Sequence, residues 1–122
     1  MAESFRDLVA WQKGMALVTE IYRATDEFPA REIYGLTNQL RRAGVSVPSN
    51  IAEGKGRLSK KEFVQFLAKA RGSLCEVQTQ LEISSNLGYL SRDTFAALDD
   101  QAREVGRVIN GLIKKIRVSP ES

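Results

Sequence analysis

The sequence contains no histidine and one cysteine, Cys75, and these absences exclude several kinds of chemistry. Without an imidazole there is no histidine base, no Ser–His or Cys–His pair and no histidine ligand for a metal. A single cysteine can form neither an internal disulfide nor the usual structural zinc sites, and it favours a reducing compartment. We therefore expect a protein that is not an enzyme and that needs no cofactor and no metal.

Long apolar runs are also missing. No stretch approaches the roughly 18 apolar residues that a membrane span requires, and no basic and apolar leader opens the chain. A chain of 122 residues fits one domain, 1–122, and at this length folding buries roughly two-thirds of the surface of the unfolded chain. These features predict a cytoplasmic protein with a single core and no membrane partner.

Helical periodicity runs through most of the chain. Apolar residues recur at alternating steps of three and four, and breaks at Phe28-Pro29, Gly54-Lys55-Gly56 and Leu87-Gly88-Tyr89-Leu90 divide the pattern into four segments. We expect helices over about 7–27, 32–54, 60–87 and 92–117. The predicted caps are Ser4 or Asp7, Ser59 with Glu62 in a capping box, and Ser91 or Asp93. Short connections predict an all-α, up-down-up-down antiparallel four-helix bundle.

Each predicted helix has an apolar seam that we expect to face the core. In the first helix the seam is Leu8, Trp11, Met15, Val18 and Tyr22, with Leu17 beside it. The other three seams are Leu36, Leu40, Ala43, Val47, Ile51 and Gly54; Phe63, Leu67, Ala70, Leu74, Val77, Leu81 and Ser84; and Phe95, Leu98, Ala102, Val105, Ile109, Leu112 and Ile116. Apolar residues beside the seams widen the core or mark a subunit contact.

Residues 39–56, QLRRAGVSVPSNIAEGKG, form the stretch around which the chain is organised. Pro48 lies inside its helical pattern, where proline lacks an N–H and disfavours helical geometry at the preceding residue, at a cost of about 3 kcal/mol. We therefore predict a second helix kinked at Pro48. Ser46 and Asn50 are expected to bond locally around the proline, and Glu53 to bond an arginine or Asn50 near Gly54.

Positive charge is concentrated in two segments. Residues 55–71 carry six basic side chains and one acidic side chain, and residues 105–122 carry four and one. The first segment is either a phosphate-binding footprint or a solvated helix start, with equal support from the sequence. The second, at a helix C-terminus, is explained by the helix dipole. The nucleic-acid-binding candidates, expected to converge near the turn between the second and third helices, are Arg41, Arg42, Lys55, Arg57, Lys60 and Lys61.

Other polar groups have simpler explanations. The carboxylates near 20–32 and 93–100 lack the Glu-x-x-His pattern of di-metal bundles, so a solvated acidic face is the better interpretation. Gly54-Lys55-Gly56 lacks the spacing of a phosphate loop and follows a helix. Cys75 is next to a core position, and we expect it to be half-buried.

The stretch QLRRAGVSVPSNIAEG closely resembles the signature of the small "four helix bundle protein" family, encoded in intervening sequences of bacterial 23S ribosomal RNA. The likeness extends through the residues around Trp11, Phe28-Pro29, Tyr34-Gly35-Leu36, 71–76 and 87–90. The resemblance implies the same bundle fold. It also implies a homo-oligomer, a ring of five, because members of the family and the related accessory variability proteins of diversity-generating retroelements look like closed rings.

Two functions follow from these expectations. The first is a non-enzymatic homo-oligomer, pentameric by resemblance, that has a basic patch and binds structured RNA or DNA or assists a nucleic-acid enzyme. The second is a scaffold or adaptor for a protein partner, in which the basic residues only keep the particle soluble. An enzyme is a distant third and would need a metal or cofactor.

Overall fold

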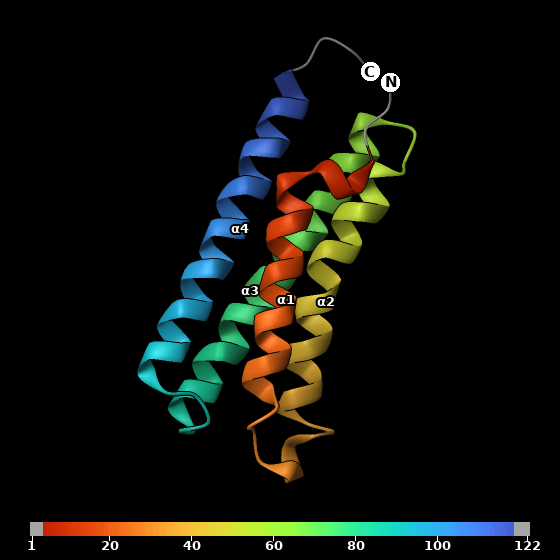
Figure 1. Cartoon of the computed structure of the whole chain (residues 1–122). Coiled ribbons are helices and arrows are strands. Elements are labelled where there is room, and N and C mark those ends of the chain that lie inside the picture. The colour runs from red at the N-terminus through yellow and green to blue at the C-terminus, as the bar shows by residue number, and fades with distance from the viewer. Residues whose placement is uncertain (1–3, 119–122) are drawn as a thin grey trace.

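The computed structural model describes residues 4–118, which form four α-helices and two single 3-10 turns and contain no strand (Figure 1). The helices are α1 (Val9–Thr25), α2 (Leu36–Lys55), α3 (Lys60–Asn86) and α4 (Arg92–Val118), and the turns are η1 (Phe5–Asp7) and η2 (Ala30–Glu32). Each helix runs opposite to the one before it (Figure 1). α1 packs against α2 and α4, and α3 packs against the same two helices. The predicted antiparallel four-helix bundle is confirmed.

The first two helices begin later than predicted. Ser4 accepts from the backbone of Arg6 and forms a capping box with Asp7, but these bonds cap η1. Leu8 then adopts extended backbone, and α1 begins at Val9 without a side-chain cap. After Pro29 the chain forms η2 before α2 starts at Leu36, where Glu32 accepts from the Leu36 amide at 3.1 Å. The delay arises because local side-chain bonds offer the backbone an alternative to the helix.

The predicted starts of the last two helices are confirmed. The Ser59 hydroxyl accepts from the Glu62 amide at 3.1 Å, and the Ser91 hydroxyl accepts from the Thr94 amide at the same distance. Between these helices Gly88 has φ +78°, and the Tyr89 amide donates to the Ser84 carbonyl at 2.9 Å. Glycine is the residue that adopts this left-handed conformation without strain, so the turn closes in few residues.

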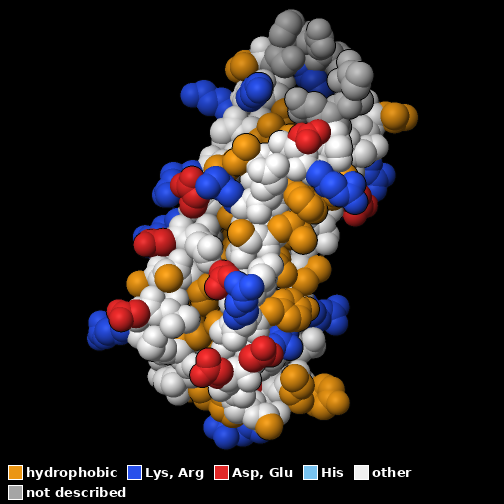
Figure 2. All heavy atoms as spheres, viewed as in Figure 1, with side chains coloured by type: hydrophobic (Ala, Val, Ile, Leu, Met, Phe, Trp, Pro, Cys, Tyr) orange, Lys and Arg blue, Asp and Glu red, His pale blue; other side chains and the backbone are white. Residues whose placement is uncertain are grey.

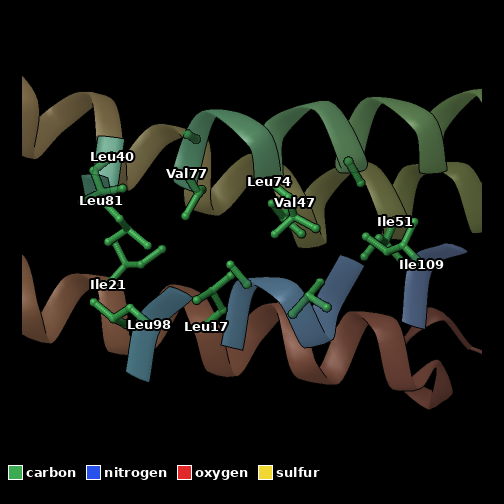
Figure 3. Packing of buried hydrophobic residues seen from close by; sticks show 14 of the residues in the cluster. Leu17, Ile21, Leu40, Val47, Ile51, Leu74, Val77, Leu81, Leu98 and Ile109 are labelled. Carbon is green, nitrogen blue, oxygen red and sulfur yellow. The ribbon is translucent and has the colours of Figure 1, made fainter. Parts of the chain in front are cut away.

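The core lies along the bundle axis and takes residues from all four helices. Figure 3 shows side chains of α2 and α3 meeting those of α1 and α4 across this core. Val47, Ile51, Val77, Leu81 and Ile109 are each fully buried. The seams predicted for the second and third helices are buried except for their first residues, Leu36 and Phe63, which are partly buried against the core. The α4 seam is buried from Leu98 to Ile109, after which Ile113 is the buried residue; Phe95, Leu112 and Ile116 are partly buried.

The seam predicted for the first helix is wrong. Its buried residues are Ala10, Gly14, Leu17, Ile21 and Thr25, so α1 turns a different face to the core. The predicted seam residues Met15 and Tyr22 are 41% and 43% exposed, while Trp11 and Val18 are half-buried. Ala10 and Gly14 face the core because their small size lets α1 approach α2 closely.

Pro48 is buried where α1 and α2 approach each other. A Cβ on Gly14 of α1 would lie 3.5 Å from the Pro48 Cβ, and one on Gly44 of α2 would lie 3.1 Å from Ile21 Cδ1. The backbone of α2 stays helical on both sides of Pro48. The contact with Gly14 offsets the cost of a proline inside a helix by burying its ring. The kink at Pro48 stays a prediction.

Candidate nucleic-acid interface

The central motif joins α2 to α3 through a small polar network. The hydroxyls of Ser46 and Ser73 lie 2.8 Å apart, and Ser73 is 7% exposed. The Asn50 amide nitrogen donates to the carbonyl of Ser46 at 2.8 Å and to its hydroxyl at 2.9 Å. Asn50 therefore bonds next to Pro48 as predicted, and Ser46 in addition bonds across the helix pair. This part of the motif stabilises the fold.

The end of α2 is fixed by two further residues of the motif. A Cβ on Gly54 would lie 2.7 Å from the Phe66 Cβ and 3.3 Å from the Phe63 carbonyl, so α3 approaches the bare backbone. Glu53 accepts from the Arg57 guanidinium at 2.7 Å, which confirms the arginine alternative for that carboxylate. This close contact sets the position of the turn that follows, residues 56–59.

Arg41 holds the end of α1 instead of facing a ligand. Its guanidinium donates to the Thr25 hydroxyl at 2.8 Å, the Tyr22 carbonyl at 3.4 Å and the Asp26 carboxylate at 3.0 Å. It also stacks on the Tyr22 ring with its carbon 4.5 Å from the centroid. A cation at the C-terminus of α1 is favoured by the helix dipole as well. These contacts give Arg41 a structural role.

Arg42 lies apart from both Arg41 and the turn. Its exposed side chain lines a polar hollow between α2 and α3, together with Ser46, Glu76 and Gln80. Arg42 and Lys55 are 13 positions apart in α2, a distance of about 20 Å along the helix. The structure therefore does not bring Arg41 and Arg42 to the turn where we expected the six cations to converge.

The remaining four candidates do gather at the turn between α2 and α3. Lys55 has its nitrogen 6.0 Å from the centroid of the Phe63 ring, and the Arg57 guanidinium lies 4.6 Å from the centroid of Phe66. Lys60 and Lys61 open α3. The aromatic rings limit the positions of the first two cations through cation–π attraction, so the charge is held near the surface of the turn.

A cation that we had assigned to the helix dipole joins this group. Arg117, near the end of α4, lines one surface hollow with Lys60 and Lys61, and the hollow measures about 340 Å³. Figure 2 shows basic side chains gathered over the C-terminal part of α4. We call Lys55, Arg57, Lys60, Lys61 and Arg117 the basic end. The sequence alone does not place Arg117 here because it lies 56 positions after Lys61; the antiparallel order of the third and fourth helices was the signal that could have found it.

Several carboxylates of the described residues form local bonds, among them those of Glu32 and Glu104. Tyr89 donates its hydroxyl to Glu32 at 2.9 Å, and together with the Leu36 amide, the larger cause, this bond lowers the pKa of Glu32. The hydrogen bond from Arg107 lowers the pKa of Glu104. No three carboxylate or thiol groups within residues 4–118 are arranged to hold a metal ion. Cys75 is exposed, contrary to expectation.

Within the same residues no helix is long and apolar enough to cross a bilayer. The apolar side chains instead alternate with polar ones along each helix, as in a bundle with one buried face.

Residues 6–111 match the family described as 23S rRNA-intervening sequence protein. A similar solved structure is the 1.70 Å crystal structure of a protein with unknown function from the S23 ribosomal protein family of Bacteroides thetaiotaomicron. It shares 21% sequence identity, and the alignment covers 87% of this chain and 99% of that one with a TM-score of 0.78, a likeness of fold. No curated protein matches the chain. Because the matched segment spans most of the sequence, the chain belongs to the 23S rRNA-intervening sequence protein family.

Proposed function

We propose that this protein is a non-enzymatic homo-oligomer that binds structured RNA or DNA through the basic end. The observation that carries the proposal is the convergence of cations from α2, α3 and α4 at one end of the bundle. Lysine and arginine contact phosphates without reading bases, so binding is strong at low salt and largely independent of sequence.

Three cations of the basic end, Arg57, Lys61 and Arg117, are exposed and can be reached by a ligand. Lys61 and Arg117 are exposed, and neither forms an ion pair within residues 4–118. Arg57 is paired with Glu53, but both side chains are largely exposed, at 41% and 54%, so a phosphate competes for the guanidinium at little cost. Repeating the basic end in several subunits raises the overall affinity by avidity.

The oligomeric part of the proposal is supported by an exposed apolar strip over α1 and α2. Met15 and Tyr22 of α1 are 41% and 43% exposed, and Val45 of α2 is 40% exposed. Trp11 and Val18 continue the three-four spacing of the strip but are half-buried, and Trp11 packs against the core. Figure 2 shows apolar side chains gathered over α1 and α2, with charged side chains among them. A strip of this kind marks a protein contact. We propose a second copy of the chain as its occupant, and five subunits by resemblance to the family's rings.

The second candidate is a scaffold or adaptor that binds another protein and has no direct nucleic-acid role. The same apolar strip favours it, because a helix of a partner protein fits a three-four seam as well as a second copy does. In this case the basic end contributes only to solubility. Assistance to a nucleic-acid enzyme combines both surfaces, with the strip bound to the enzyme and the basic end to its template.

Light scattering on the purified protein tests the two functions together. The mass is measured before and after nuclease treatment, and again after a step to high salt. The proposal predicts a multimer that carries nucleic acid at low salt and releases it at high salt. A clean particle without nucleic acid at every salt concentration contradicts the binding function and favours the adaptor. A monomer contradicts the oligomer.

A further inference from the structure

The hollow at the basic end is lined by both cationic and apolar side chains. Its cations are Lys60, Lys61 and Arg117, of which Lys61 and Arg117 are exposed. Val64 of α3 and Ile116 of α4, which we call the floor of the hollow, are half-buried and pack against the core. Gln65 is the sixth lining residue, so none of the six is acidic. A site for phosphate alone needs only the cations. The apolar floor indicates a ligand that is anionic at one side and flat and apolar at the other.

A nucleotide has these two sides, but only when its base is unpaired. In a duplex the base faces are covered by stacking, whereas single strands offer their faces to protein side chains. The volume of about 340 Å³ is at the lower end of the roughly 300–1,000 Å³ typical of small-ligand sites. The hollow is therefore sized for one small group and not for a groove of double helix.

We propose that this hollow holds one unpaired nucleotide of a single-stranded loop or end, with its base against Val64 and Ile116 and its phosphates against Lys60, Lys61 and Arg117. The exposed Gln65 amide offers both a donor and acceptors beside the base, which suits any of the four bases. The inference rests on the proposed function, and it specifies which part of a structured nucleic acid the basic end selects.

Binding of three fluorescent RNAs to the unaltered protein tests the inference without any variant. The probes are an eight-nucleotide single strand, the same strand with its central bases removed, and a blunt twelve-base-pair duplex, each titrated at one salt concentration. We expect the abasic strand to bind roughly fivefold more weakly than the intact strand, because the floor loses its apolar partner. Equal affinity of the intact and abasic strands overturns the inference.

The duplex separates failure of the inference from failure of the proposed function. If neither single strand nor duplex binds, the proposed function is wrong. If duplex and both single strands bind alike, the basic end binds phosphates and the base-holding role of the hollow is wrong. The two failures therefore give different patterns across the same three probes.

A pair of matched variants tests whether the base lies against the floor of the hollow. Ile116→Ser removes apolar surface from the hollow, and Val118→Ser changes the same helix end at a side chain that is 74% exposed and does not line the hollow. We expect Ile116→Ser alone to weaken the intact strand to the level of the abasic strand. Crosslinking of a 4-thiouridine strand to unaltered protein covers the case in which Ile116→Ser does not fold. Crosslinks in the peptides containing Val64 or Ile116 support the inference, and crosslinks confined to other peptides contradict it.

Discussion

Gly54 and Phe66 hold α2 and α3 at a separation that leaves no room for a side chain between them. A Cβ added to Gly54 would lie 2.7 Å from the Cβ of Phe66, closer than carbon atoms pack, and Phe66 cannot move its Cβ without moving α3. The basic end begins at the next residue, Lys55. The spacing of the helix pair and the position of its cations are thus set at the same point.

Gly54→Ala is therefore expected to destabilise the fold although alanine favours helices. Overpacking costs about 1–3 kcal/mol, and the gain in helix propensity returns at most ~1 kcal/mol. The control is Gly72→Ala on α3, where an added Cβ meets nothing within 4 Å. Urea unfolding should show a loss for the first variant and an equal or higher stability for the second. A Gly54→Ala protein more stable than the unaltered one would contradict the close contact.

The Ser46–Ser73 bond makes a prediction about coupling between α2 and α3. Replacing either serine by alanine leaves a half-buried or buried hydroxyl without its partner, at a cost of about 1 kcal/mol. The double variant should cost less than the two single variants added together, because both members of the bond are gone. A double-mutant cycle of unfolding free energies measures this, and strictly additive values would show that the bond does not contribute.

Arg41 and Arg42 are neighbours in sequence with opposite expected behaviour. Arg41→Ala removes bonds to Thr25, Tyr22 and Asp26, so we expect a loss of about 1–2 kcal/mol in the free energy of unfolding. We expect Arg41→Lys to be almost as unstable as Arg41→Ala, since an ammonium group lacks the planar arrangement of N–H donors that a guanidinium uses to bond several partners. Arg42→Ala is the control and should change stability by less than about 0.5 kcal/mol. Equal effects of the two substitutions would contradict the structural role of Arg41.

The carboxyl group of Glu32 makes the free energy of unfolding depend on pH in the acidic range. Its pKa is lowered in the folded protein by the Leu36 amide and the Tyr89 hydroxyl. A lowered pKa means that the carboxylate stabilises the fold above its unfolded pKa of about 4.3 and stops doing so as pH falls through the lower, folded pKa. Glu32→Gln should thus be less stable than the unaltered protein at pH 6, with the difference shrinking towards pH 3. A difference that is constant across this range would contradict the shift.

The sequence predicts most of the fold because apolar spacing is strong in three of the four helices. It fails for the first helix for a physical reason. The predicted seam of Trp11, Met15, Val18 and Tyr22, two of them exposed and two half-buried, is more apolar than the buried face of the helix. Gly14 and Ala10 face the core because they are small, and a pattern based on hydrophobicity ranks small residues low.

The candidate site was predictable only where its residues are close in sequence. Lys55, Arg57, Lys60 and Lys61 share one turn, and their proximity follows from the helix boundaries. Arg117 lines a hollow with Lys60 and Lys61 because α4 packs against α3. The Arg41 guanidinium is hydrogen-bonded to Thr25 of α1 and therefore lies away from this hollow. Such long-range partners depend on helix rotation and register, which residue spacing along one helix does not determine.

The central claim is that nucleic acid binds at the basic end, and a matched pair of charge reversals tests it most directly. One variant carries Lys60→Glu and Lys61→Glu, and the other carries Arg31→Glu and Arg92→Glu at the opposite end of the bundle, so both lose the same net charge (Figure 1). Filter binding of a structured RNA is measured over graded salt. The account predicts that the first variant weakens binding by roughly tenfold and flattens its salt dependence, while the second stays within about twofold. Equal losses in the two variants, or affinity no better than micromolar for the unaltered protein at low salt, would contradict it.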